Sequence, residues 1–121
     1  MNSKIVIGTW PLSGDYGKIE SEKVREILEY CHNLGINEFD TAPNYGNGFV
    51  EEQLGKVFGN DNKILINTKI GNLPFKKKSY DVLDLKNSFE DSLKRLDRDS
   101  VNVLFLHNPR DEIKNYEKIL D

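Results

Sequence analysis

Short apolar runs alternate with helical patterns along this chain, and the alternation limits the folds that it can adopt. The apolar runs predict β-strands at residues 4–9, 36–39, 63–68 and 101–106. Apolar residues recur three and four positions apart, as in a helix with one buried face, in residues 21–34, 50–58, 84–96 and the opening of a segment at 112–120. Successive strands lie about 30 residues apart, the length of a βαβ unit. The pattern therefore predicts an α/β fold with a parallel sheet.

Two parallel architectures fit this pattern: an open, doubly wound sheet and part of a (β/α)8 barrel. No strand is followed by a G-x-G-x-x-G turn, which counts against the dinucleotide-binding open sheet. We therefore expect the parallel (β/α) units of a TIM-type barrel, with residues 1–121 as a single partial barrel domain. Such barrels run to about 250 residues, so about the first half would be present. Either the chain is a fragment, or a second copy or another chain completes it.

Composition narrows the range of partners. The chain has 121 residues, of which 37% are hydrophobic and 31% charged, as in a soluble globular protein. The formal net charge is -3 and no basic face stands out, so we expect no nucleic-acid partner. The sequence shows no signal peptide and no stretch long enough to span a membrane, which predicts a cytoplasmic protein. The single cysteine, Cys31, falls on the apolar stripe Val24, Ile27, Leu28, Leu34, and we expect it to be buried.

Four reactive side chains follow strands two, three and four. Asp40 and Tyr45 come after the second strand, Lys69 after the third and His107 after the fourth. A tyrosine has an ordinary pKa of about 10, but a neighbouring ammonium stabilises its phenolate. Lys69 would make Tyr45 a usable general acid, while Asp40 would hold the lysine in place. His107 could donate a hydrogen bond to a substrate oxygen, and the set predicts carbonyl reduction.

Each of these residues taken alone also has a structural interpretation. Asp40 could form a turn, Tyr45 could pack with a solvated hydroxyl, Lys69 could be a solvated strand end, and His107 could be a structural histidine. Their combination favours function. A rival hypothesis uses Lys69 as the Schiff-base amine of an aldolase barrel, against which the preceding Asp40 and Tyr45 argue.

Other polar residues carry weaker predictions. Asp40, Asp61 and Asp84 lie in different units without metal-ligand spacing, and no paired His or Cys motif is present, so no metal is predicted. His32 lies beside the buried stripe of the first helix and is expected to be structural or exposed. The run 76–78 consists of three lysines that could attract an anionic substrate or a cofactor phosphate, although such runs are usually solvated.

Six segments of the chain, in order, resemble the aldo-keto reductase family. They are Gly8-Thr9-Trp10, Asp40-Thr41-Ala42-Pro43-Asn44-Tyr45-Gly46, Glu51-x-x-Leu54-Gly55, Thr68-Lys69, Ser92-Leu93-Lys94-Arg95-Leu96 and Leu106-His107-Asn108-Pro109. The resemblance covers nearly the whole chain. It implies that Tyr45 is the proton donor, that Lys69 and Asp40 activate it, and that His107 orients the carbonyl.

The same resemblance implies a cofactor and a small-molecule carbonyl substrate. NADPH would supply the hydride and would be bound without a Rossmann fold, near Thr9, Trp10 and Asp40. The substrate would contact Trp10, Tyr45, His107 and Asn108, although Trp10 could equally cover the end of the barrel core. The half that grips the cofactor is missing from these residues, so we expect weak or no binding by the chain alone. The alternative is a catalytically silent half-barrel used for binding or assembly, with self-association or a complementing chain closing it.

Overall fold

The computed structural model describes residues 4–76 and 78–107. Strands and helices alternate as the sequence predicts. In chain order they are β1 Val6–Gly8, α1 Ser21–Asn33, β2 Glu38–Asp40, α2 Phe49–Phe58, β3 Leu65–Ile70, α3 Val82–Leu96 and β4 Val103–Leu106. Three short 3-10 helices, which periodicity did not predict, are η1 Trp10–Ser13, η2 Tyr45–Gly48 and η3 Pro74–Lys76. Asn108 and the predicted helix at 112–120 lie outside the described residues.

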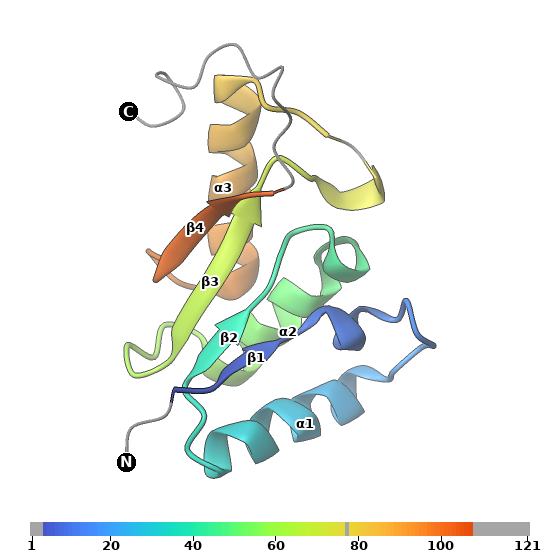
Figure 1. The fold of residues 1–121 in the computed structure, drawn as a ribbon, viewed down its shortest axis with the longest axis vertical. Helices are drawn as coiled ribbons and strands as arrows, with labels where there is room; N and C mark the ends of the chain where they lie inside the picture. Colours follow the sequence, from blue (N-terminus) through green and yellow to red (C-terminus); the bar gives the residue numbers. More distant parts are fainter. Residues whose placement is uncertain (1–3, 77, 108–121) are drawn as a thin grey trace.

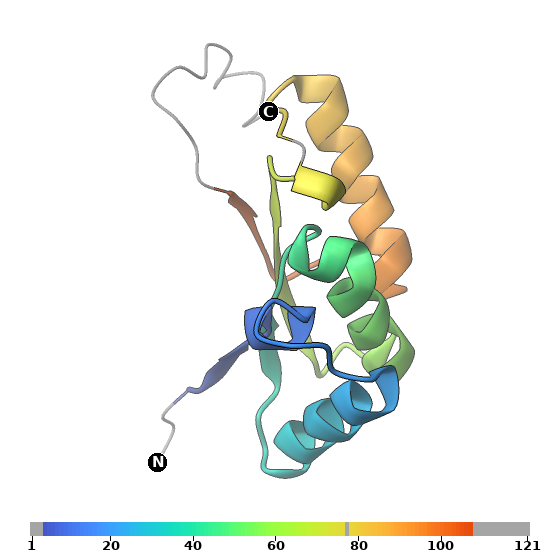
Figure 2. The ribbon, with the colours of Figure 1, turned by 90° about the vertical axis from the view of Figure 1, so that its right-hand side faces the viewer.

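The four strands form one parallel sheet in the order β1-β2-β3-β4. Helices α1, α2 and α3 all cover the same face of the sheet, and Figure 2 shows them as a single layer beside the strands of Figure 1. A doubly wound sheet would place helices on both faces and reverse its strand order at a switch point. Sequential order with a one-sided helical layer is instead the arrangement of successive (β/α) units in a barrel. We call the uncovered face the inner face.

Strands β2 and β3 end later in the chain than the apolar runs predict. Strand β2 includes Asp40, and β3 includes Lys69 and ends at Ile70. The ladder extends this far because Thr9 N donates to Asp40 O at 2.9 Å and Thr41 N donates to Asn67 O at 2.8 Å. Asp40 and Lys69 are therefore held within the sheet, where main-chain bonds fix their positions.

The hydrophobic core lies between the sheet and its helices. Phe39 from β2 and Ile66 from β3 are almost fully buried, and each such side chain contributes about 2 kcal/mol by leaving water. The other buried apolar members of the core cluster are Leu12, Val24, Leu28, Val50, Leu54, Ile64 and Leu96. Alternation along the strands sends Phe39 and Ile66 to the helices and the flanking residues to the inner face.

Near the end of α1 the structure departs from the predicted apolar stripe at Leu34 and Cys31. Gly35 ends the helix with a φ of 90°, a conformation that favours glycine. Leu34 is 62% exposed because it is the C-cap residue and has already turned away from the buried stripe. Cys31 is a free thiol, and it is only partly buried against the core.

Helices α2 and α3 touch backbone to backbone. A Cβ atom at Gly55 would overlap the main-chain oxygen of Arg95, so only glycine allows this approach. Beside this contact, the carboxylate of Glu51 is fully buried and accepts hydrogen bonds from Thr68 Oγ1 at 2.8 Å, Ser92 Oγ at 3.1 Å and Arg95 Nε at 2.9 Å. We call Glu51, Thr68, Ser92 and Arg95 the helix-side cluster. It ties α2 and α3 to strand β3.

The inner face carries polar as well as apolar side chains. Glu38 accepts a hydrogen bond from Asn67 Nδ2 at 2.7 Å and pairs with Lys4 Nζ at 2.8 Å. These two contacts lower the pKa of Glu38. On the edge strands Val6 is 43% exposed and Phe105 47% exposed. Among the described residues, no helix is long and apolar enough to cross a membrane.

Candidate active site

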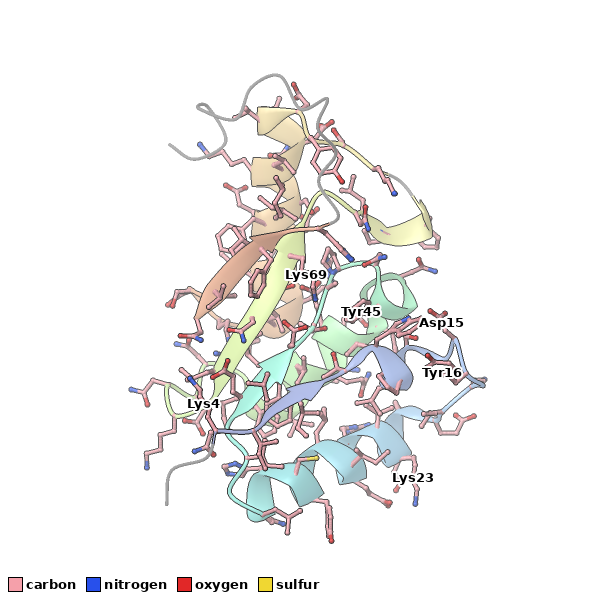
Figure 3. All side chains as sticks on the ribbon, viewed as in Figure 1. Lys4, Asp15, Tyr16, Lys23, Tyr45 and Lys69 are labelled. Carbon is pink, nitrogen blue, oxygen red and sulfur yellow. The ribbon has the colours of Figure 1, made fainter. Side chains whose placement is uncertain are left out.

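Lys69 lies at the centre of a cluster at the C-terminal ends of β2 and β3 (Figure 3). Its Nζ donates hydrogen bonds to Asp40 Oδ2 at 3.1 Å, to the main-chain oxygen of Thr41 at 2.8 Å and to Tyr45 Oη at 3.2 Å. We call Asp40, Tyr45 and Lys69 the lysine cluster. The Lys69 side chain is 14% exposed and that of Asp40 31% exposed. The structure thus brings three of the four predicted catalytic residues into direct contact.

A tight loop carries Tyr45 back over the strand ends. Tyr45 N donates to Ala42 O at 3.2 Å, and the next three residues all have positive φ. At Gly46, where φ is 62°, a Cβ atom would lie 2.9 Å from Ser13 O. Glycine is therefore needed for both the conformation and the space, and it lets the phenol fold onto Lys69.

The hydrogen bonds of Lys69 decide between two chemical roles. An ammonium has three donors and no acceptor, and here all three donors are engaged. The three acceptors around Nζ hold it as a hydrogen-bond donor, and this arrangement argues against a Schiff-base amine. Tyr45 Oη accepts from Lys69, so the phenol keeps its own hydrogen for another acceptor.

His107, just after β4, faces Tyr45 across the site. The two rings meet edge to face, with centroids 6.4 Å apart and planes at 89°. Burial lowers the pKa of His107, the positive charges of Lys69 and Lys78 lower it further, and Asp40 acts in the opposite direction. The imidazole is therefore neutral near pH 7. Its Nδ1 is enclosed and has no hydrogen-bond partner within the described part of the chain.

The residues predicted to meet a cofactor lie on the β1 side of the cluster. Thr9 is buried, and its Oγ1 donates to Asp40 O at 2.8 Å. Trp10 is 45% exposed, and its Nε1 donates to Asp15 Oδ2 at 2.7 Å. Gly8 pairs with Asp40 in the sheet, and a Cβ atom at Gly8 would meet nothing within 4 Å. This open space beside the carboxylate fits the approach of a flat ring or a ribose, and the cofactor contacts stay predictions.

Some contacts of the site carried no sequence signal. The Thr41 main-chain oxygen accepts from Lys69, and Tyr80 Oη donates to the main-chain oxygen of His107 at 2.8 Å. A main-chain acceptor has no residue-type signature, and Tyr80 lies 27 positions before His107. Of the predicted lysine run, Lys78 is exposed and Lys77 lies outside the described residues. Asn108 also lies outside them.

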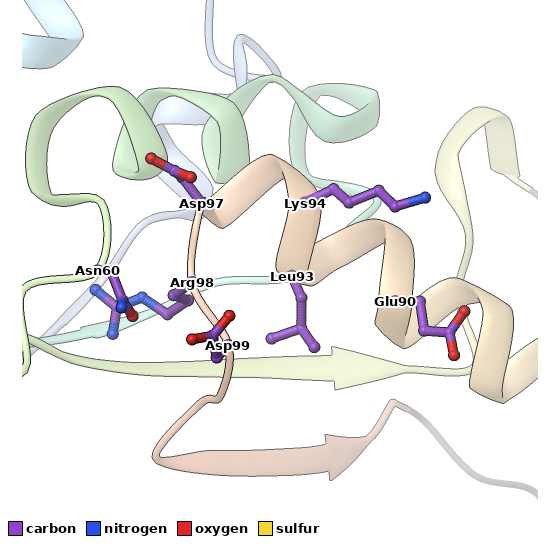
Figure 4. A pocket seen from close by; sticks show the side chains of 7 residues that line it. All are labelled: Asn60, Glu90, Leu93, Lys94, Asp97, Arg98 and Asp99. Carbon is purple, nitrogen blue, oxygen red and sulfur yellow. The ribbon is translucent and has the colours of Figure 1, made fainter.

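Other regions of the described chain are separate from the site. A groove of about 600 Å³ lies at the opposite end of the sheet (Figure 4), lined by Asn60, Glu90, Leu93, Lys94, Asp97, Arg98 and Asp99. There Arg98 donates to Ile64 O at 3.0 Å and Gly59 O at 2.7 Å, which joins the loop before β3 to the end of α3. His32 is exposed and packs edge-on against Phe58. Within residues 4–76 and 78–107, no group of three His, Cys, Asp or Glu side chains is placed to hold a metal ion.

Comparison with known proteins identifies the family. The family model described as "Aldo/keto reductase family" matches residues 4–121. The chain belongs to the aldo/keto reductase family. An aldo-keto reductase of Bacillus subtilis (strain 168) is 30% identical over 115 residues, which cover 88% of this chain and 34% of that protein. A protein of Arabidopsis thaliana named "Probable voltage-gated potassium channel subunit beta" is 33% identical over 113 residues, with the same two shares.

Solved aldo-keto reductase structures share the fold. The holo form of an aldo-keto reductase from Bacillus halodurans superimposes with a TM-score of 0.75 and 30% identity, over 86% of this chain and 35% of that one. Glycerol dehydrogenase from Gluconobacter oxydans gives a TM-score of 0.71 and 29% identity, over 90% and 36%. The prediction of a TIM-type barrel is thereby confirmed. The chain spans about a third of the length of the curated relatives that it matches.

Proposed function

We propose that these residues form the proton-transfer half of an NADPH-dependent carbonyl reductase that converts an aldehyde or ketone to an alcohol. One observation carries the proposal: Lys69 Nζ lies 3.2 Å from Tyr45 Oη and 3.1 Å from Asp40 Oδ2. A charged lysine in contact with a phenol stabilises the phenolate that proton donation leaves behind. The carboxylate keeps that charge in place.

The proposed reaction adds hydride to the carbonyl carbon and a proton to the oxygen. When bound, the nicotinamide cofactor supplies the hydride, and Thr9, Trp10 and Asp40 are the residues of this chain that would hold it. As the C=O π bond opens, its electron pair goes to oxygen, which takes the proton of Tyr45 Oη. Neutral His107 donates a hydrogen bond to the same oxygen, so developing charge is met from two sides.

The decisive variant is Tyr45→Phe, which keeps the ring and removes the acid. We expect kcat for NADPH-dependent reduction of aldehydes to fall about 10²- to 10⁴-fold, the range for loss of a general acid. Turnover is measured by cofactor oxidation in a preparation in which a complementing segment closes the barrel. Tyr30→Phe is the matched control, because Tyr30 is 65% exposed on α1, away from the site. Full kcat in the Tyr45→Phe variant would show that the mechanism is wrong.

Cofactor binding by the 121-residue chain is a separate proposal. We expect it to be weak or absent, because the chain spans about a third of the curated relatives and phosphate sites in such barrels lie in the loops after the last strands. Titration of the purified chain with NADPH, followed by cofactor fluorescence, measures this. Tight binding would contradict the expectation.

A second candidate is a catalytically silent half-barrel that serves in binding or assembly. Exposed apolar side chains at the two edges of the sheet favour it, with Val6 of β1 at 43%, Phe105 of β4 at 47% and Ile5, just before β1, at 58% exposure. The relative named as a potassium channel subunit also lends it weight. Sedimentation and turnover distinguish the two. A monomer without activity in any mixture supports the silent module, whereas a homodimer that gains activity supports a barrel assembled from halves.

A further inference from the structure

The main chain of His107 is held from two directions at the end of strand β4. Its N–H donates to Ile70 O at 2.7 Å, which continues the ladder with β3. Its carbonyl oxygen accepts from Tyr80 Oη at 2.8 Å. The carbonyl lies one residue beyond the last residue of β4, so a side chain from the loop after β3 provides what the sheet ladder does not.

The loop that carries Tyr80 is closed on itself and anchored to α3. Ser79 N donates to Gly71 O at 3.0 Å, and Asn72 and Lys78 form an antiparallel bridge. Ser79 Oγ donates to Asp84 Oδ2 at 2.7 Å at the start of α3. The loop that carries Tyr80 is therefore bonded to Gly71 at the end of β3 and to Asp84 at the start of α3.

The ring of Tyr80 lies close against Gly71. A Cβ atom built at Gly71 would be 2.6 Å from Tyr80 Cε1, and the φ of Gly71 is 113°. Gly71 itself follows Ile70, whose carbonyl accepts from His107. The end of β3, the Tyr80 ring and the end of β4 therefore form one continuous contact.

We propose that Tyr80 is a positioning residue for His107, whose hydroxyl fixes the strand end so that the imidazole stays edge-on to Tyr45 inside the site. The inference rests on the proposed function for the role of His107, although its central claim concerns geometry alone. The charged groups that act on the imidazole are Lys69 from β3, Lys78 from the loop and Asp40 from β2. The ring of Tyr45 faces the imidazole, and the hydroxyl of Tyr80 binds the main-chain oxygen of His107.

The first test is an NMR titration of the His107 imidazole in the full 121-residue chain. In Tyr80→Phe the strand end loses one of its two anchors while the ring remains. We expect the imidazole to become more solvated, so that its pKa rises toward the ordinary value of about 6.5, and the nuclear Overhauser contacts between the rings of Tyr45 and His107 to weaken. Tyr30→Phe should change neither. An unchanged titration with unchanged ring contacts overturns the proposal.

A second pair of variants reaches the same contact from the other side. Gly71→Ala and Gly14→Ala each place a side chain at positive φ, but only at Gly71 does the new Cβ meet the Tyr80 ring. Gly71→Ala should shift the His107 titration as Tyr80→Phe does, and Gly14→Ala should leave it unchanged. Equal behaviour of the two glycine variants counts against the proposal.

Kinetics separate this inference from the proposed function. In an active preparation, Tyr80→Phe should lower kcat by roughly 10-fold or more, as misplacement of a reacting group does, with little change in the KM for the cofactor. A raised cofactor KM with unchanged kcat contradicts a role at His107. If the imidazole titration shifts and no carbonyl is ever reduced, the positioning role stands and the proposed function fails.

Discussion

Two pairs of oppositely charged side chains lie on opposite faces of strand β3, and they differ in how far the carboxylate of each pair is exposed to solvent. Lys69 and Asp40 meet at 3.1 Å on the inner face, with side chains 14% and 31% exposed. Arg95 and Glu51 meet at 2.9 Å on the helix side, with side chains 19% and 0% exposed. Adjacent residues of one strand, Lys69 and Thr68, serve the two clusters because successive side chains point to opposite faces.

The contrast teaches what each pair can do. Both carboxylate oxygens of Glu51 accept hydrogen bonds, and removing Arg95 would leave the Glu51 charge buried without its ion-pair partner. The lysine cluster is partly open to solvent, and Tyr45 keeps a proton to give. The buried pair is suited to holding the helices on the sheet. The open pair is suited to a change of charge during a reaction.

The largest expected effect is on the open pair. Lys69→Met removes the charge beside Tyr45 and should lower kcat/KM about 10²- to 10⁴-fold, through loss of activated general-acid catalysis. The free energy of unfolding should change by less than about 1 kcal/mol, because the Asp40 carboxylate left behind is partly exposed and can be hydrated. Turnover and urea unfolding of the same preparation measure both quantities. A large loss of stability without loss of activity would reverse the assignment of the two clusters.

The buried pair should respond in the opposite sense. Glu51→Ala leaves the Arg95 guanidinium and two hydroxyls without their acceptor, and should lower the free energy of unfolding by about 3 kcal/mol. Glu52→Ala is the matched control, since Glu52 is the exposed neighbour on the same helix and its loss should cost about 0.5 kcal/mol or less. Chemical denaturation followed by circular dichroism measures the difference. Equal unfolding midpoints for the two variants would show that the buried Glu51–Arg95 pair does not stabilise the fold.

A smaller change tests the link between the faces. Thr68→Val keeps the volume of the side chain and removes one hydrogen bond to the buried carboxylate, which should cost about 1.5 kcal/mol of unfolding free energy. Thr68→Ser keeps the hydroxyl and should recover most of that loss. If the valine variant is as stable as the parent, the helix-side cluster does not depend on its bond to β3.

The smallest expected effect is a pH slope from His107. Burial and two lysines lower the pKa of its imidazole in the folded state, so the unfolded chain binds more protons between that value and about 6.5. Stability should therefore fall as pH drops below about 6.5 and level off below the folded-state pKa. In His107→Gln this part of the slope should disappear from urea midpoints measured against pH. A slope of the same size in the variant would assign it to other groups.

The sequence predicts the architecture well because the governing signals are local. Apolar runs locate the strands, helical spacing locates α1, α2 and α3, and Gly35 marks the end of the first helix. The end of β2 is missed by one residue and that of β3 by two, because the hydrogen bonds that extend β2 to Asp40 depend on Thr9 and Asn67, which are far away in sequence. The buried face of α3 also includes Ser88 and Ser92, whereas Phe89 and Leu93 are only partly buried, and apolar spacing alone does not indicate this.

The site follows a similar division. The contact of Asp40, Tyr45 and Lys69 could be predicted because each is a reactive residue in a strand or in the loop that follows it. Tyr80 could not, since its hydroxyl meets a main-chain oxygen and its position depends on how the loop after β3 closes. The buried bonds of Glu51 were equally hidden, although the residue stands in a matching motif, because a motif does not state what a side chain contacts.

The backbone contact at Gly55 has a consequence for Tyr45, which lies in the loop before α2. Because α2 rests directly on the α3 main chain, side-chain rotation cannot relieve a clash at Gly55, and the loop of η2, which begins with Tyr45, immediately precedes α2. A displacement of α2 would therefore act on the loop that carries Tyr45. A methyl group at Gly55 would push α2 away from α3, and we expect this displacement to move the Tyr45 hydroxyl away from Lys69.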